Sequence, residues 1–151
     1  MNESGMEHGN KLIRELNGVK YFIDSGTNAE RIIGTLNAYN RRIILLTAGY
    51  DKDVVTDSLC ETLLQKVRHL ILVGRTASLI EIAVLKIMSG KYRNIDLRIT
   101  KCSTLQQGVD CAYLSARPDD IVLLSPVSFD YDMFSDFEEC KNQYQEYVMN
   151  L

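Results

Sequence analysis

The chain has 151 residues, of which 46% are hydrophobic and 25% are charged, and its formal net charge is −3 at pH 7. This length predicts one domain, and the composition is ordinary for a soluble globular protein. A slightly acidic balance gives no electrostatic footprint for nucleic acid or for an anionic membrane surface. The longest apolar runs, such as residues 43–46 and 121–124, are the size of strands, so we expect no membrane insertion.

The N-terminal residues and the cysteines bear on the compartment. Residues 1–5 lack the basic and apolar regions of a signal peptide, and we expect them to be a disordered lead or an artificial boundary before a domain at residues 6–151. The four cysteines form no C-x-x-C pair and the chain has two histidines, a pattern that does not favour a zinc site. Free thiols in a reducing, cytoplasmic compartment are the simplest interpretation.

The first predicted elements are the two strands of a β-hairpin. Residues 12–16 and 19–23 are strand-like runs that flank Asn17 and Gly18. Asn-Gly between two such runs is a strong hairpin signal, because a type I′ turn needs positive φ at both central residues. The chain is therefore expected to open with an antiparallel pair.

From residue 19 onward, strands and helices alternate to the end of the chain. Apolar side chains at helical spacing predict helices at residues 28–39, 56–67, 76–88, 104–116 and 132–151. Short apolar runs predict buried strands at residues 42–48, 69–74, 96–100 and 119–125. The alternation predicts an α/β fold with three layers: a mostly parallel sheet of about six strands, with helices on both faces and the N-terminal hairpin at one side.

Three polar loops follow strands and are expected at one edge of that sheet, where open α/β folds bind ligands. They span residues 24–28, 48–52 and 125–132. The turn from Asp24 to Asn28 could meet an anion at the start of a helix, or could only turn the chain and cap that helix. Lys52 could bind a carboxylate or phosphate, or could be a solvated loop residue.

Several common motifs are absent from the sequence. The chain has no G-x-x-x-x-G-K-[ST] phosphate loop, so it should not bind nucleotide phosphates in the Walker manner, and it has no G-x-G-x-x-G and no G-x-S-x-G. His69 begins a predicted strand, and a structural role is favoured over a catalytic one.

Six short segments carry a resemblance to a known family. They are residues 7–9 (Glu-His-Gly), 17–20 (Asn-Gly-Val-Lys), 24–28 (Asp-Ser-Gly-Thr-Asn), 48–53 (Ala-Gly-Tyr-Asp-Lys-Asp), 123–126 (Leu-Leu-Ser-Pro) and 131–140 (Tyr-Asp-Met-Phe to Phe-Glu-Glu-Cys). In their order and spacing they resemble the C-terminal domain of the Mur ligases, most of all those that add D-glutamate in peptidoglycan synthesis.

The resemblance implies a Rossmann-like domain that closes over an upstream ATP-binding domain. In such a ligase, ATP with Mg²⁺ phosphorylates a carboxylate of UDP-N-acetylmuramoyl-L-alanine, and D-glutamate attacks the acyl phosphate. By likeness, Thr27, Lys52 and Phe137 would lie at the amino-acid substrate, while Asp24 and Asn28 would belong to the nucleotide site. ATP and Mg²⁺ would be needed by the full-length enzyme, with none bound tightly by this domain. Because these residues lack the phosphate loop of the upstream domain, the chain alone should neither hydrolyse ATP nor form an amide.

The sequence departs from the family pattern at its charged positions. Gly9 stands where the family has an arginine, and the turn at residues 24–28 is one residue shorter and lacks its lysine. Asp130 falls at the position that meets the D-glutamate carboxylate, where an acid would repel it. Two interpretations stay open: a divergent ligase domain, or a non-catalytic module derived from a Mur ligase that binds a small molecule or a partner protein.

Overall fold

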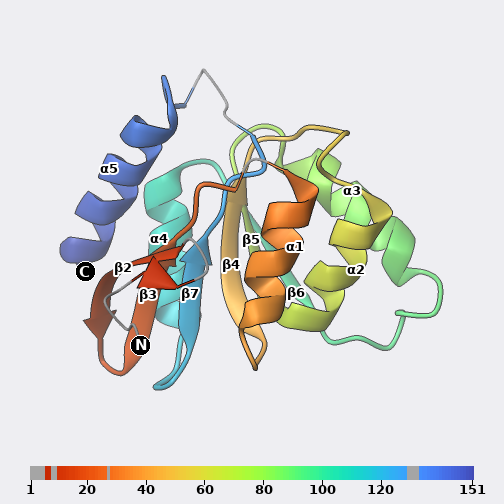
Figure 1. Cartoon of the computed structure of the whole chain (residues 1–151), viewed down its shortest axis with the longest axis horizontal. Coiled ribbons are helices and arrows are strands. Elements are labelled where there is room, and N and C mark those ends of the chain that lie inside the picture. Colours follow the sequence, from red (N-terminus) through yellow and green to blue (C-terminus); the bar gives the residue numbers. More distant parts are fainter. Residues whose placement is uncertain (1–5, 8–9, 27, 129–132) are drawn as a thin grey trace.

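The protein is described by a computed structural model that covers residues 6–7, 10–26, 28–128 and 133–151. Figure 1 shows one twisted sheet between two layers of helices. Its seven strands have the order β1-β2-β3-β7-β4-β5-β6. Their bounds are β1 (Met6–Glu7), β2 (Asn10–Leu16), β3 (Val19–Ile23), β4 (Ile43–Ala48), β5 (Val67–Val73), β6 (Arg98–Cys102) and β7 (Ile121–Leu124). The predicted architecture is confirmed, with the two-residue β1 added at the edge.

The predicted hairpin joins β2 to β3. The two strands pair antiparallel, and β1 pairs antiparallel with β2. Asn17 and Gly18 have φ values of 56° and 81°, as a type I′ turn requires. From β3 to β6 every neighbouring pair is parallel.

Five helices are present in the described residues and cover both faces of the sheet. They are α1 (Ala29–Ala38), α2 (Asp57–Lys66), α3 (Ala77–Met88), α4 (Leu105–Ser115) and α5 (Phe137–Met149). Helices α1, α2 and α3 pack on one face, and α4 and α5 pack on the other. Within the described part of the chain, no helix combines the length and the hydropathy that crossing a membrane would require.

Strand β4 shows why the strands read as continuous apolar runs. All six of its residues are buried. Ile43 and Leu45 contribute to the core beneath α1, α2 and α3, whereas Ile44 and Leu46 contribute to the core beneath α4 and α5. Successive side chains of a strand point to opposite faces, so a strand covered on both sides must be apolar at every position.

Several boundaries differ from prediction by a few residues; β2 begins at Asn10 and β5 at Val67, each two residues early. The local reasons are clear for two others. Strand β6 starts at Arg98, because its ladder with β5 begins there, and the Asp96 carbonyl accepts instead from the Arg42 side chain at 2.8 Å. Helix α5 starts at Phe137, because the Asp136 side chain caps it by accepting from the Glu139 amide at 2.9 Å. The predicted lead at residues 1–5 lies outside the described residues.

Candidate functional site

Strand β7 creates a switch point in the sheet. It lies between β3 and β4, although it follows them in the chain. The chain leaves β3 and β4 toward α1 and α2 on one face, but leaves β7 toward α5 on the other. Neighbouring connections that diverge to opposite faces open a crevice at the carboxyl ends of their strands, and open α/β sheets bind ligands there.

Hydrogen bonds join the three strand ends at this crevice. The Asp24 amide donates to the Leu124 carbonyl at 2.8 Å, and the Ser125 amide donates to the Leu46 carbonyl at 3.0 Å. The Thr47 hydroxyl donates to the Ser125 carbonyl at 2.6 Å. The prediction that these loops share one edge is confirmed for their described parts, and residues 27 and 129–132 lie outside them.

Two glycines let the loops approach backbone to backbone. Gly26 and Gly49 have φ values of 68° and 79°. A Cβ atom on Gly26 would lie 2.0 Å from the Pro126 carbonyl oxygen, and one on Gly49 would lie 2.1 Å from the Ser128 carbonyl oxygen. Each loop after β3 and β4 therefore rests directly on the loop after β7, and side chains larger than glycine cannot be accommodated at either contact.

Asp24 lies beneath the crevice and links the elements around it through its side chain. Its side chain is fully buried. Its Oδ1 atom accepts from the Arg31 guanidinium at 3.0 Å, and its Oδ2 atom accepts from the hydroxyls of Thr35 at 3.3 Å and Ser125 at 3.4 Å. Both oxygens are thus engaged inside the domain. The predicted contact with a nucleotide stays a prediction, and the structure gives Asp24 a second role in joining β3, α1 and β7.

Asn28 caps the start of α1, which is one of the two roles that the sequence predicted for it. Its backbone is extended and its side chain accepts from the Arg31 amide at 2.8 Å, which is the geometry of an N-cap. The residue itself is exposed. Its predicted part in a nucleotide site is not excluded by the cap, because the carboxamide NH₂ group is not used in that hydrogen bond.

Lys52 stands on the loop after β4, at the predicted edge. The loop is shaped by Asp51, whose side chain accepts from the Asp53 amide at 2.9 Å and whose carbonyl accepts from the amides of Val54 and Val55. Lys52 is exposed, and no hydrogen bond or ion pair engages its side chain within the described residues. Its ammonium group is available to an anionic ligand.

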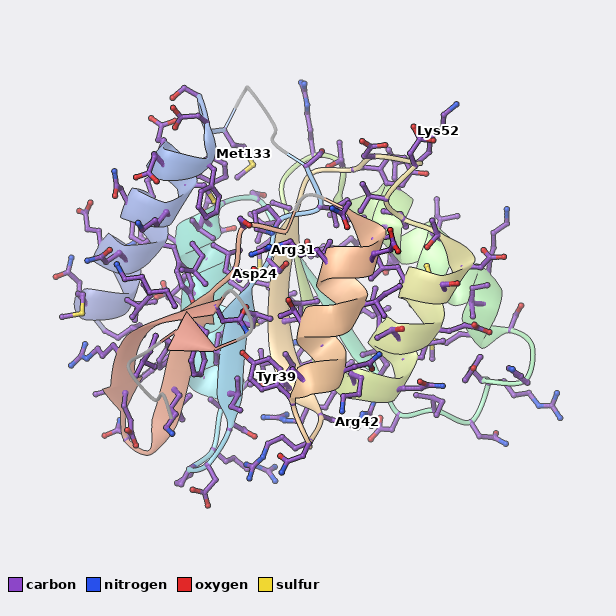
Figure 2. All side chains as sticks on the ribbon, in the orientation of Figure 1. Asp24, Arg31, Tyr39, Arg42, Lys52 and Met133 are labelled. Carbon is purple, nitrogen blue, oxygen red and sulfur yellow. The ribbon has the colours of Figure 1, made fainter. Side chains whose placement is uncertain are left out.

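The structure does not bring Lys52 and Phe137 together. Phe137 packs against the core beneath α4 and α5, whereas Val54 and Val55, close to Lys52, pack into the opposite core. Figure 2 shows Lys52 and Met133, four residues before Phe137, at the same edge but well apart. Thr27 and Asp130 lie outside the described residues. A shared contact of these four residues with one amino acid therefore remains a prediction.

His69 lies away from the crevice, near the start of β5 and beside the edge strand β6. It is buried, its Nδ1 atom is 2.9 Å from the Ser115 hydroxyl, and its Nε2 atom is 2.8 Å from the Thr100 hydroxyl. Burial, together with the nearby Arg98 and Arg68 guanidinium groups, lowers its pKa from 6.5 to about 4. A neutral, fully bonded imidazole fits the structural role that the sequence favoured.

Arg31 and Ser125 are the crevice residues whose contacts the sequence interpretation missed. One signal was present, since Arg31 and Thr35 are four positions apart in α1 and must share a face of that helix. Both side chains meet Asp24 from that face. The contact between Ser125 and Asp24 spans 101 positions in the chain and follows only from the strand order.

Among the described residues, no group of three or more histidine, cysteine, aspartate and glutamate side chains could hold a metal ion. The described crevice instead offers hydroxyl, ammonium and guanidinium groups. These are donors, and donors suit carboxylate and phosphate ligands.

Comparisons with known proteins agree with this geometry. Residues 10–127 match the family described as Mur ligase, glutamate ligase domain. A UDP-N-acetylmuramoylalanine–D-glutamate ligase of Acetivibrio thermocellus is 38% identical over 149 residues, which cover 98% of this chain and 32% of that protein. The chain thus spans about a third of the length of the curated relatives it matches.

Solved structures support the same fold. A UDP-N-acetylmuramoyl-L-alanyl-D-glutamate–2,6-diaminopimelate ligase superposes with a TM-score of 0.57 at 15% identity, over 91% of this chain and 31% of that one. Folylpolyglutamate synthase of Mycobacterium tuberculosis, in complex with ADP and AMPPCP, superposes with a TM-score of 0.55 at 14% identity, over 78% and 28%. At these identities the superpositions bear on fold, and together with the sequence match they show that this chain belongs to the Mur ligase, glutamate ligase domain family.

Proposed function

We propose that this chain is the C-terminal domain of an ATP-dependent amide ligase that adds D-glutamate to UDP-N-acetylmuramoyl-L-alanine in bacterial peptidoglycan synthesis. One observation carries the proposal: the ends of β3, β7 and β4 meet at one switch point. The loops that follow these strands hold family-like segments. The names of relatives that match nearly the whole chain support the choice of amino acid. The free cysteines are in keeping with a cytoplasmic reaction.

The proposed reaction divides the work between domains. ATP, bound with Mg²⁺ on an upstream domain, supplies the phosphoryl group that activates the carboxylate of UDP-N-acetylmuramoyl-L-alanine. The amine of D-glutamate then attacks the carbonyl carbon, the new C–N bond forms, and inorganic phosphate leaves. This domain would hold the amino acid so that its amine faces the carbonyl, because holding two reactants in the reactive geometry lowers the barrier to their reaction.

Each predicted site residue has a proposed part in that task. Lys52 offers an exposed ammonium group to a D-glutamate carboxylate. Thr27 and Phe137 would line the same amino acid, and Asp130 would face its second carboxylate. Asp24 and Asn28 would belong to the nucleotide side of the cleft that this domain forms with its partner domain. An acid at position 130 would weaken binding of a dianionic substrate.

A chimeric ligase tests the function directly. This chain would replace the C-terminal third of the A. thermocellus relative, and phosphate release would be measured with UDP-N-acetylmuramoyl-L-alanine, ATP and each candidate amino acid. We expect release that depends on D-glutamate and that falls at least about tenfold in Lys52→Ala, as loss of a charged contact predicts. Lys91→Ala is the matched control, since Lys91 is 74% exposed and lies on a different loop, after α3.

The chimera separates the two interpretations of the sequence. A chimera that folds and binds ATP but turns over no amino acid would contradict the ligase proposal and favour a binding module. Asp130→Ser gives a second, independent test, because removing the acid should lower the KM for D-glutamate. An unchanged KM would remove Asp130 from the proposed amino-acid site.

A further inference from the structure

Arg31 places a positive charge at the switch point. It lies in the first turn of α1, directly above the buried Asp24, and its side chain is 39% exposed. Figure 2 shows Asp24 and Arg31 side by side where β3 ends and α1 begins. Asp24 itself is completely enclosed, so the part of this ion pair that faces solvent is the guanidinium.

The carboxylate beneath Arg31 is held in place by other elements. Its second oxygen receives hydroxyl hydrogen bonds from Thr35 on α1 and Ser125 after β7. The Asp24 amide is bonded to the Leu124 carbonyl, so the backbone is fixed as well. A carboxylate held in this way anchors the Nη2 end of the guanidinium, which reduces the side-chain entropy that a ligand would otherwise have to remove.

Arg31 has donors to spare. A guanidinium carries five N–H groups, and the contact with Asp24 uses the Nη2 atom. Within the described residues, no second acceptor engages its side chain. The start of α1 adds the positive end of a helix dipole at the same place. Half-exposed donors in a fixed orientation suit a planar or tetrahedral oxyanion.

We propose that Arg31 binds an oxyanion of the ligand at the switch point and that Asp24 is the positioning residue that aims it. The proposal rests on the proposed function, because it assigns the anion to the ligand of that site. Either a phosphate of the nucleotide or a carboxylate of the amino acid has this chemistry. Arg31 thereby supplies a positive charge to a loop that holds none between Asp24 and Asn28.

The test titrates this chain with inorganic phosphate and, separately, with D-glutamate and with MgATP, while NMR follows the Arg31 side chain and the amides of Ser25 and Gly26. We expect saturable shifts that weaken at least about tenfold in Arg31→Gln and less in Arg31→Lys, because lysine keeps the charge but loses the fork of donors. Arg93→Gln is the control, with the same change of net charge on an exposed turn residue between α3 and β6.

Variants of Asp24 separate a loss of stability in Arg31→Gln from a loss of anion binding. Arg31→Gln leaves the Asp24 carboxylate buried without its charge partner, which destabilises the fold. The double variant Asp24→Asn/Arg31→Gln removes both charges, so it should recover thermal stability without recovering anion binding. In Asp24→Asn alone, Arg31 keeps its charge, and we expect faster guanidinium rotation in the NMR line shape together with weaker binding.

The outcomes distinguish this inference from the proposed function. Shifts with phosphate or MgATP but not D-glutamate would assign Arg31 to the nucleotide, and the reverse would assign it to the amino acid. Wild-type affinity in Arg31→Gln, or no saturable shift with any of the three ligands, would overturn the inference. An active chimeric ligase that keeps its activity with Arg31→Gln would overturn the inference and leave the ligase proposal intact.

Discussion

The buried imidazole of His69 makes the stability of this domain depend on pH. In the folded chain its pKa is lowered to about 4 by burial and by the Arg98 and Arg68 charges, whereas an exposed histidine titrates near 6.5. Between these two values the unfolded chain binds a proton that the folded chain does not. Lowering the pH through this window therefore favours unfolding, and the stability that the neutral His69 contributes is complete only above pH 6.5.

The size of the effect follows from the difference between the two pKa values. Linkage gives a loss of about 2 kcal/mol between pH 7 and pH 5, and of about 3 kcal/mol by pH 4. Domains of this kind have a total stability of about 5 to 15 kcal/mol. One side chain would then account for a measurable part of the acid sensitivity of the fold.

Urea unfolding of wild type and His69→Gln at several pH values isolates this contribution. Glutamine retains a donor and an acceptor for Ser115 and Thr100 but does not titrate. The free energy of unfolding should fall by about 2 kcal/mol more in wild type than in the variant between pH 7 and pH 5. His8→Gln assigns the NMR signal of the remaining histidine. Parallel curves for the two proteins, or a His69 midpoint near 6.5 in the folded state, would refute the reasoning.

Four further substitutions test the packing around the site and the helices. Gly49→Ala should destabilise the domain by at least about 2 kcal/mol in urea unfolding, because its Cβ would meet the Ser128 carbonyl oxygen at 2.1 Å and φ is 79°. Gly34→Ala, whose Cβ meets nothing within 4 Å in α1, should stabilise it by up to about 1 kcal/mol, and equal effects of the two changes would contradict the contact. Tyr144→Phe should be neutral or raise the melting temperature, since the buried hydroxyl has no hydrogen-bond partner among the described residues; a loss above about 1 kcal/mol would reveal an unrecognised partner. Arg14→Gln should lower the free energy of unfolding by about 1 kcal/mol and increase hydrogen exchange in the last turn of α5. Arg14 donates to two carbonyls of that turn, which has no basic residue of its own, and unchanged exchange would count against this capping role.

Local patterns were enough to predict most of the fold. The Asn-Gly hairpin, the cap at Asn28 and the buried strands each depend on neighbouring residues in the chain. The ends of β6 and α5 were placed less well. Pairing with β5 sets the start of β6 at Arg98, and the cap at Asp136 sets the start of α5. One boundary thus depends on tertiary pairing and the other on one side-chain hydrogen bond.

The candidate site was predicted in outline but not in its contacts. Loops after buried strands indicated the edge, because parallel strands end on one side of a sheet. The order β3-β7-β4, which puts Ser125 beside Asp24, depends on where β7 inserts, and no local pattern encodes that choice. The distance between the start of α5 and Lys52 likewise follows from α4 and α5 covering the opposite face.

At the switch point, tightly packed backbone lies next to exposed charged side chains, and these two kinds of position should differ in their effect on ligand specificity. The backbones of the three strand ends contact one another through Gly26 and Gly49, so the shape of the crevice can change little without loss of the fold. Lys52 instead reaches the edge as an exposed side chain with no such restriction on its replacement, and the half-exposed Arg31 can be replaced when its buried partner Asp24 is neutralised as well. A change of ligand at this edge would therefore be made by exchanging charged side chains on a fixed frame. We therefore expect substitutions of Arg31 and Lys52, and not of the contact glycines, to alter which anion binds. In variants that keep the charges balanced, the melting temperature should stay the same.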